Sequence, residues 1–295
     1  MSETLRQRFA YHAYASADRI ARSLPERLGR RVFLAAAHLH HRFGSKTRAT
    51  VAANFSRVLG RPADSDVVRS AVREAFELYW RYWLDTFRLR TMTPAEFEKR
   101  MEYEGLEHID RALEAGNGVV TVLPHMGNWD AAGRWLSLNG YRVISVAEAV
   151  QPERLLDLFM RHREELGLKI LTLEGGGGTG KKLARRLAEN WIVALVADRD
   201  LSGKGIEVEM FGAERKLPVG PALLSLQSGA ALLVCPVYTT DDGWFCRVGA
   251  PIEIDRTGEM RKDVGALTRA MGAEFERAIA ARPADWHMFQ PAWES

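Results

Sequence analysis

His125 and Asp130 are the two residues whose types and spacing point most directly to chemistry. They lie in the segment Leu123-Pro-His-Met-Gly-Asn-Trp-Asp130. A neutral imidazole can take a proton from a hydroxyl group, and a carboxylate beside it can accept a hydrogen bond from the other ring nitrogen. That bond would fix the tautomer and stabilise the protonated ring. The pair therefore predicts a base-catalysed reaction, with His125 as general base and Asp130 as the residue that orients it.

The sequence around His125 contains the elements that would position it. Proline cannot continue a strand ladder, so the apolar run 118–123 ends there and His125 emerges at its carboxyl edge, where open α/β sheets bind ligands. Gly127 permits a turn, and Asn128 is a suitable cap for the helix that follows. Asp130 would then lie in the first helical turn, folded back towards His125. The competing interpretation is a core histidine followed by a carboxylate that interacts with the helix dipole.

From about residue 115 onwards, short β-rich runs alternate with helical stretches. We expect strands over 118–123, 142–147, 169–173, 192–197, 231–238 and 244–250, and helices over 128–138, 152–166, 180–190, 217–229 and 261–281. This alternation predicts an α/β fold with a central, largely parallel or mixed sheet flanked by helices. Because no repeat or low-complexity linker divides the chain, we expect residues 1–295 to form one domain with a helical N-terminal extension.

A second helical block, residues 66–90, carries a crowd of aromatic side chains. Such spacing is typical of core packing or of a groove wall, and it would also suit an apolar slot for a long ligand. Both interpretations stay open for the set Phe76, Tyr79, Trp80, Tyr82, Trp83 and Phe87.

The net charge of the chain is unevenly distributed. The total is only +3 (41 − 38), but residues 1–60 hold 11 Lys and Arg against three acidic residues, a balance of +8, which leaves −5 for the rest. Residues 4–44 read as helical with apolar residues near the 3.6 period, interrupted at Pro25. An amphipathic, arginine-rich arm over 1–60 indicates an interfacial membrane anchor or a solvated surface helix.

Several classes of protein are disfavoured by what the sequence lacks. Cys235 and Cys246 are too few for a disulfide framework or a four-ligand zinc site, and we expect both to be buried, reduced sheet residues. No apolar segment resembles a signal peptide or approaches the roughly 20 residues of a spanning helix. No DNA-binding motif is present, so we expect no nucleic-acid partner.

Several ordered segments resemble a known family. His125-Met-Gly-Asn-Trp-Asp130 is similar to the H-x4-D signature of the lysophospholipid acyltransferase superfamily, and in particular to its lipid A late acyltransferase branch. Four further segments are similar to actinobacterial phosphatidylinositol mannoside acyltransferases, namely Val196–Leu201, Gly205–Gly212, Pro218–Pro221 and Arg282–Pro291. The resemblance extends from about Leu78 to Trp293, which is far more specific than a histidine and an aspartate alone.

The resemblance implies a glycerol-3-phosphate acyltransferase-like fold and an activity. The reaction would move a fatty acyl chain, expected to be palmitoyl, from acyl-CoA to a mannose hydroxyl of phosphatidylinositol mannoside. It implies His125 as base, Asp130 as its orienting residue, and Asp198 in place of the family's other catalytic carboxylate, a glutamate one methylene longer. Acyl-CoA would be a co-substrate, with no other cofactor and no metal, at the cytoplasmic face of the plasma membrane as a peripheral protein.

Substrate binding is assigned on the same basis. Glu148 matches an acidic residue near the sugar, and Arg163 a basic residue that suits a phosphate or a developing oxyanion. We also assign to the substrate Asn128, Arg199, Lys204 and Gln227. Without the resemblance, Arg163 reads as a solvated charge and Asp198 as a cap or turn residue.

One alternative is disfavoured, and two stay open. Gly175–Lys182 satisfies G-x4-G-K, but Lys182 stands where a Ser or Thr should bind Mg²⁺, so we do not expect a nucleotide-binding loop. The chain could instead be a non-catalytic protein that binds lipid at an anionic membrane surface. The acceptor could also be another glycolipid or a lysophospholipid.

Overall fold

The computed structural model describes residues 3–173 and 178–293. Its helices are α1 Leu5–Ser23, α2 Glu26–Phe43, α3 Ser45–Leu59, α4 Asp66–Arg88, α5 Pro94–Glu98, α6 Glu107–Glu114, α7 Trp129–Leu138, α8 Glu153–Glu165, α9 Gly178–Ala188, α10 Gly220–Ser228 and α11 Met260–Ala281, with short 3-10 turns η1 Leu89–Thr91 and η3 Pro283–Asp285. Its strands are β1 Met101–Glu104, β2 Val119–Leu123, β3 Val143–Ala147, β4 Lys169–Thr172, β5 Ile192–Val196, β6 Ile206–Met210, β7 Ala213–Leu217, β8 Ala231–Val234, β9 Val237–Thr239 and β10 Trp244–Arg247.

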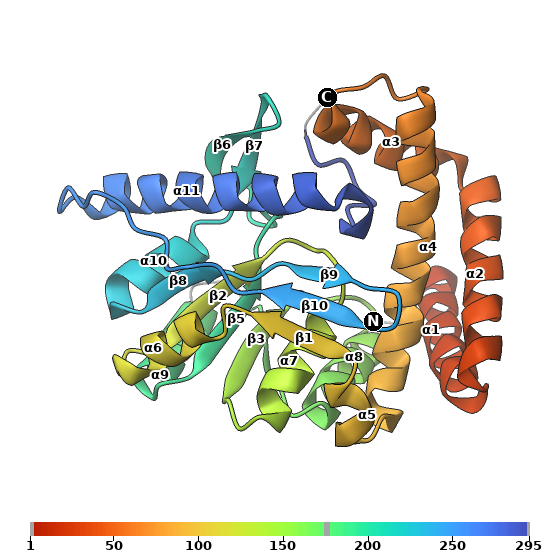
Figure 1. Cartoon of the computed structure of the whole chain (residues 1–295), viewed down its shortest axis with the longest axis horizontal. Helices are drawn as coiled ribbons and strands as arrows, with labels where there is room; N and C mark the ends of the chain where they lie inside the picture. Colours follow the sequence, from red (N-terminus) through yellow and green to blue (C-terminus); the bar gives the residue numbers. More distant parts are fainter. Residues whose placement is uncertain (1–2, 174–177, 294–295) are drawn as a thin grey trace.

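A five-stranded parallel sheet forms the centre of the molecule (Figure 1). Its strand order is β4-β3-β5-β2-β8, and every neighbouring pair runs parallel. Strand β2 is buried along its whole length, because its apolar side chains face a core on either side. Val120 and Val122 pack with helices α9, α10 and α11, whereas Val119 and Leu123 pack with α6 and α7. The predicted α/β fold, with helices on both faces, is confirmed.

Several strands depart from the expected pattern. The run 231–238 is not one strand but two, β8 and β9, separated at Pro236, which has no amide hydrogen for a ladder. Strand β9 leaves the parallel sheet and pairs with β10, which also pairs with β1. The hairpin β6–β7 and the short polar strand β1 were not expected, because their alternation lacks the apolar runs of buried strands.

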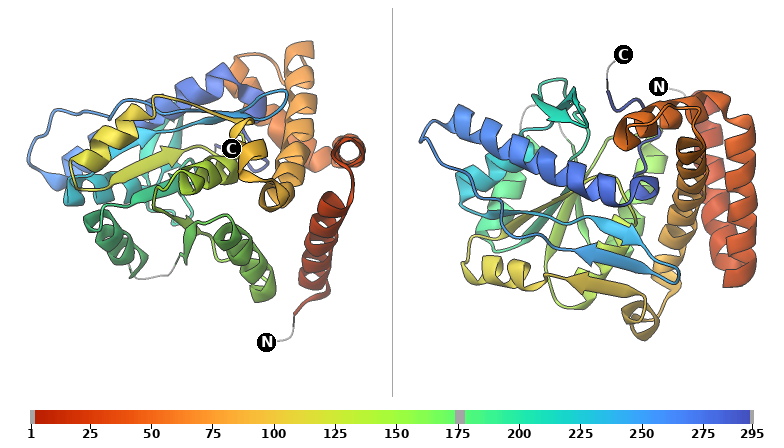
Figure 2. Two further views of the ribbon diagram at one scale, coloured as in Figure 1. Left: turned by 60° about the horizontal axis from the view of Figure 1, so that its bottom comes forward. Right: turned by 45° about the horizontal axis from the view of Figure 1, so that its top comes forward.

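The N-terminal helical region packs along one side of the α/β body. Helix α1 ends at Ser23 and α2 begins at Glu26, so the expected break at Pro25 is confirmed. Helix α2 lies along α4, and α1 lies beside α8 (Figures 1 and 2). Tyr14 of α1 contacts the ring of Phe159 on α8, with ring centroids 4.7 Å apart. The arm is therefore docked at α8, a helix that also reaches the site described next.

Candidate active site

The parallel sheet brings His125 and Asp198 together at its carboxyl edge. Strands β2 and β5 are neighbours, and Leu123 pairs with Val196. His125 and Asp198 each follow two residues after that last pair. The Nδ1 atom of His125 is 2.5 Å from Oδ1 of Asp198, and the His125 backbone N–H donates to Oδ2 over 3.1 Å. Two residues that are 73 positions apart thus form a histidine–carboxylate pair.

Asp130 does not make the hydrogen bond that the spacing predicted. Its carboxylate accepts bonds from Arg163, with Nε to Oδ1 at 2.7 Å, and from the Tyr82 hydroxyl at 3.3 Å. Within residues 3–173 and 178–293, no hydrogen bond joins His125 to Asp130. Asp198 occupies the position beside the imidazole that Asp130 was predicted to take. The reason is strand order, which places the end of β5 next to the end of β2.

The environment of Asp198 keeps it ionised. Its side chain is fully buried, which alone would raise its pKa. His125, the positive charge of Arg215 and a hydrogen bond from Trp286 outweigh burial and hold the pKa of Asp198 well below its usual value. As a carboxylate, Asp198 accepts the proton of Nδ1. In the neutral ring, Nε2 then carries the lone pair and can act as a base.

The C-terminal tail holds the loop that carries His125. Trp286 pairs with Met126 in an antiparallel bridge, and its indole Nε1–H donates to Oδ2 of Asp198 over 2.8 Å. The backbone N–H of His287 donates to the His125 carbonyl over 2.7 Å. Sequence reasoning noted this tail only for its resemblance. The signal in the sequence of the tail was the run Asp285-Trp-His287, which follows a long helix.

The turn after His125 explains its glycine. Gly127 has a φ of +57°, and its backbone lies so close to β9 that an added Cβ would sit 2.2 Å from the Val237 carbonyl oxygen. Asn128 then caps α7 as expected, accepting the N–H of Ala131 over 2.9 Å. Its amide also donates to the Thr86 hydroxyl, and the residue is buried. Asn128 therefore holds the helix in place, and it does not line the cavity as the substrate-binding assignment required.

A cavity of about 860 Å³ opens beside His125. Its wall is mostly apolar and includes side chains from β2, β5, α7 and the tail. The aromatic block of α4 is divided between the two roles that its spacing left open. Phe76 and Phe87 are buried in the core. The cavity wall receives the other members that face it, namely Tyr79, Tyr82 and Trp83.

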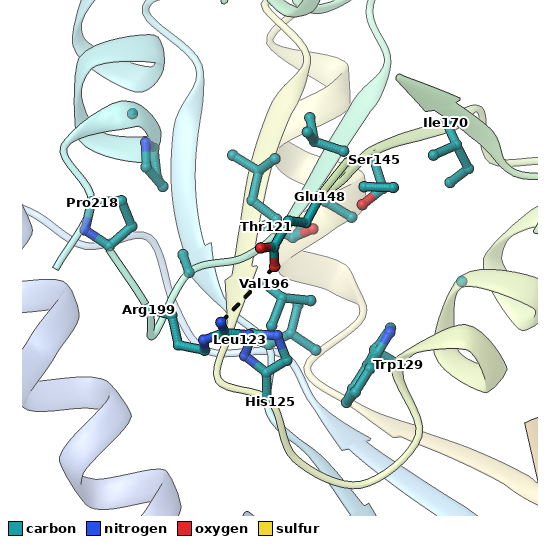
Figure 3. Close-up of a pocket in the computed structure, with 18 of the residues that line it drawn as sticks. Thr121, Leu123, His125, Trp129, Ser145, Glu148, Ile170, Val196, Arg199 and Pro218 are labelled. Atoms are coloured by element: carbon teal, nitrogen blue, oxygen red, sulfur yellow. Dashed lines mark ion pairs between the residues drawn. The ribbon is translucent and has the colours of Figure 1, made fainter. Parts of the chain in front are cut away.

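Charged groups lie at the cavity wall close to the histidine (Figure 3). The dashed line in Figure 3 marks the ion pair between Glu148 and Arg199, whose atoms are 3.9 Å apart. On the other side of the His125 ring lies Trp129, edge-on, with ring centroids 5.5 Å apart. Arg163 also lines the cavity, and contact with Asp130 outweighs the effect of burial and raises its pKa above the usual value. Arg163 therefore stays protonated and places a positive charge at the cavity wall.

The other residues assigned to substrate binding also differ in whether they line the cavity. Gln227 of α10 lines the cavity, as do Arg199 and Glu148. Lys204 lies on an exposed turn and is not part of the cavity wall. Of the glycine-rich segment Gly175–Lys182, the first three residues lie outside the described part of the chain, and Lys181 lies at the cavity.

The two cysteines are reduced and buried, as expected. Both line the cavity, Cys246 from β10 and Cys235 from the segment after β8. Burial raises the pKa of Cys235 well above its usual value and that of Cys246 to about 12. Because the thiolate is the nucleophilic form, these side chains belong to the apolar wall and are poor nucleophiles at neutral pH.

Comparison with known proteins shows the family. The sequence matches the family described as bacterial lipid A biosynthesis acyltransferase over residues 3–295. This chain belongs to that acyltransferase family. The membership confirms the resemblance that the H-x-G-N-W-D segment suggested, and it places the acyltransferase's His125 motif, cavity and C-terminal tail within one matched region.

Named relatives of the acyltransferase fall into two groups. Phosphatidylinositol mannoside acyltransferase of Mycolicibacterium smegmatis is 39% identical over 281 residues, covering 95% of this chain and 90% of its own length. The protein of the same name from Mycobacterium tuberculosis (strain CDC 1551 / Oshkosh) is 39% identical over 284 residues, covering 95% of this chain and 87% of its own. Lipid A biosynthesis acyltransferase of Haemophilus influenzae is 25% identical over 191 residues, or 63% of this chain and 57% of its own.

Proposed function

We propose that this acyltransferase moves a fatty acyl chain, in the first instance palmitoyl, from acyl-CoA to a mannose hydroxyl of phosphatidylinositol mannoside. One observation carries the proposal: the His125–Asp198 pair lies at the wall of a large, mostly apolar cavity. A base beside an apolar cavity suits the transfer of a long acyl chain to a hydroxyl group. The acceptor is proposed from the printed names of the two mycobacterial relatives.

The chemistry needs one proton acceptor that later becomes a donor. Nε2 of His125 takes the proton of the sugar hydroxyl as the oxygen attacks the thioester carbonyl carbon, and a tetrahedral oxyanion forms. The carbon–sulfur bond then breaks, and protonated His125 returns the proton to the departing CoA sulfur. Asp198 stabilises the imidazolium between the two steps. Because a thioester is already activated, positioning and charge stabilisation suffice for the remainder of the barrier.

Arg163 is proposed to bind the negative charge of a substrate. Asp130 accepts hydrogen bonds from its guanidinium, and the Tyr82 hydroxyl donates to the same Asp130 carboxylate, so that the cation is pre-positioned at the cavity wall. An arginine placed in this way suits a phosphate group or the oxyanion of the tetrahedral intermediate. We therefore propose that Asp130 acts through Arg163 and that Asp198 orients His125.

The enzyme is further proposed to work at an anionic membrane surface, as a peripheral protein on the cytoplasmic face of the plasma membrane. The outward face of α1 exposes Leu5 (83%) and Phe9 (74%), and that of α2 exposes Leu39 (59%) and Phe43 (77%). Arginines flank these apolar residues, as in interfacial helices. Within the described residues, no helix combines the length and the apolar character that crossing a membrane requires.

The test compares wild type with His125→Ala, using palmitoyl-CoA and purified phosphatidylinositol mannoside and measuring CoA release together with the mass of the lipid product. We expect product that is heavier by one acyl chain in wild type and a loss of about 10³-fold or more in the variant, as for other general bases that also position their substrate. Unchanged turnover in a folded His125→Ala protein would reject the mechanism.

The same assay separates the alternative functions. A lipid A precursor and a lysophospholipid are offered as competing acceptors, and preferential acylation of either would reassign the acceptor while keeping the base. Lipid binding without acyl transfer to any of the three would identify a non-catalytic lipid-binding protein. A Mg-ATP titration serves as the control for the glycine-rich segment, and we expect no heat of binding.

A further inference from the structure

The His125–Asp198 pair can supply a base only if Asp198 is ionised while His125 is neutral. A fully buried carboxylate needs a counter-charge, because its desolvation is costly. If protonated His125 were that counter-charge, the imidazole would already hold the proton that it has to accept. A working base therefore requires a second cation near Asp198 that is not the histidine.

Arg215 supplies that cation from strand β7. Its side chain is buried, and its guanidinium donates to the backbone carbonyl of Asp198. No carboxylate among the residues that the structure describes forms an ion pair with Arg215, and its Nε and Nη1 atoms have no hydrogen-bond partner there. The guanidinium instead lies over two indoles, with its central carbon 5.7 Å from the Trp286 ring centroid and 5.3 Å from that of Trp293.

Trp286 supplies the matching hydrogen bond. Its fully buried indole donates to Oδ2 of Asp198 over 2.8 Å, while Oδ1 faces the Nδ1 atom of His125. The two carboxylate oxygens are thus used on different sides, one by the tail and one by the imidazole. A neutral N–H donor favours the ionised form of the carboxylate without adding a proton that could be transferred.

The other charged groups around the pair largely compensate one another. Asp130 is paired with Arg163, and Glu148 with Arg199. Asp200 accepts bonds from the 202–205 turn. Burial lowers the pKa of His287 to about 4, so this neighbour is neutral. Besides Arg215 on β7, the titratable groups named here that line the cavity beside the pair are Tyr82 on α4, Asp130 on α7, Glu148 after β3, Arg163 on α8, Arg199 and Asp200 after β5, and His287 in the tail.

We propose that Arg215 and Trp286 are positioning residues that keep Asp198 ionised while His125 is neutral, so that the imidazole is available as a base near neutral pH. This inference rests on the proposed function, in which His125 is the base. Neither residue touches the substrate cavity. Both act through Asp198, and both come from segments remote in sequence from the histidine motif.

The test removes the positive charge of Arg215 in one variant and retains it in another. Arg215→Gln retains an amide that can reach the Asp198 carbonyl, and Arg215→Lys retains the charge. Arg277→Gln, which removes an exposed arginine on α11, is the matched control. Without Arg215, Asp198 is compensated only by protonating His125. We expect the acidic limb of the kcat/KM–pH profile to move up by about one pH unit, a loss of about tenfold on that limb that recovers at higher pH.

A second readout does not depend on catalysis. Histidine-labelled protein is titrated by NMR, with the His125 signal assigned from its absence in His125→Ala. We expect the midpoint of His125 protonation to rise in Arg215→Gln, to rise less in Trp286→Phe, and to stay in place in Arg215→Lys and Arg277→Gln. If the acyl transfer assay fails in wild type, the proposed function fails, yet this titration still decides the present inference.

The contrary outcomes are distinct. A folded Arg215→Gln protein with the wild-type midpoint would overturn the inference, and so would a loss of activity that is equal at every pH, because that is the pattern of a structural defect. If thermal unfolding shows that Arg215→Gln does not fold, Trp286→Phe carries the same test, and an unchanged midpoint there overturns the inference.

Discussion

Burial has opposite effects on the two titratable residues that flank Trp286. It raises the pKa of Asp285 to about 6 and lowers that of His287 to about 4, because in each case it disfavours the charged form. Asp285 accepts the backbone N–H of Thr239, and the His287 Nε2–H donates to the Gly127 carbonyl over 3.0 Å. Near neutral pH His287 is therefore neutral, whereas Asp285 is largely ionised and takes up a proton only as the pH falls through about 6, so acid acts on the two residues differently.

The pH dependence of stability follows from His287. Its folded pKa of about 4 lies below the ordinary value of 6.5, so the unfolded chain binds more protons between these pH values. The contribution is complete above pH 6.5 and is lost as the pH falls towards 4. We expect the unfolding free energy of wild type, relative to His287→Gln, to decrease by about 3 kcal/mol over that window.

Denaturant titrations at several pH values measure this difference. Asp285 changes protonation over part of the same window with the opposite sign, but it is present in both proteins and so cancels in the comparison. The glutamine amide can still donate to the Gly127 carbonyl, which makes it the matched replacement. A wild-type-minus-variant difference that stays constant from pH 7 to pH 4.5 would contradict the assignment.

At the scale of elements, small side chains open the space beneath the strand ends. Thr121 of β2 and Ala194 of β5 pair in register, and both line the cavity. Across from them, α7 presents Ala132 and Gly133 to the same cavity, and a Cβ on Gly133 would lie 3.0 Å from the Leu168 side chain. We propose that the acyl chain lies between this sheet face and α7, because the small side chains at these positions leave a space that larger residues would fill.

Filling that space is expected to discriminate between acyl donors. Ala194→Phe places a ring between β5 and α7, so we expect turnover with palmitoyl-CoA to fall about tenfold or more, at an overpacking cost of about 1–3 kcal/mol. Turnover with a short donor such as butyryl-CoA should change little. Parallel assays with the two donors, together with thermal unfolding, make the measurement. An equal loss with both donors would place the acyl chain elsewhere.

At the scale of the whole molecule, α2 has two apolar faces. Gly29, Phe33 and Ala37 are buried towards α4, while another stripe faces solvent. The exposed stripe repeats at four, seven and four residues along one helical face and consists of Leu28, Val32, Leu39 and Phe43. The balance of +8 over residues 1–60 surrounds it. A solvated helix needs no outer apolar stripe, and the proposal of an interfacial role for α2 rests on this stripe.

Membrane binding is tested by replacing exposed apolar side chains of α2 with negatively charged ones. The double variant Leu39→Glu/Phe43→Glu should bind anionic phospholipid vesicles at least tenfold more weakly, since burying each side chain is worth about 1.5–3 kcal/mol. Val67→Glu, an equally exposed position at the start of α4, is the matched control and should bind as wild type does. Co-sedimentation at low and high salt measures both effects, and wild-type binding should weaken as salt screens the arginines. Undiminished binding by the double variant would leave the stripe without a membrane role.

The layered α/β architecture, the end of β2 before His125, the cap at Asn128 and the family could all be predicted from the amino-acid sequence. These features depend on periodicity, on proline and glycine, and on short contiguous motifs, which are local properties. The carboxylate that faces His125 became evident from the folded structure. The motif suggested Asp130, five residues away, but the order of parallel strands is a non-local property and brought Asp198 there instead. Arg215 and Trp286 reach the same carboxylate from a hairpin and a tail, because burial of Asp198 requires partners that no local pattern specifies.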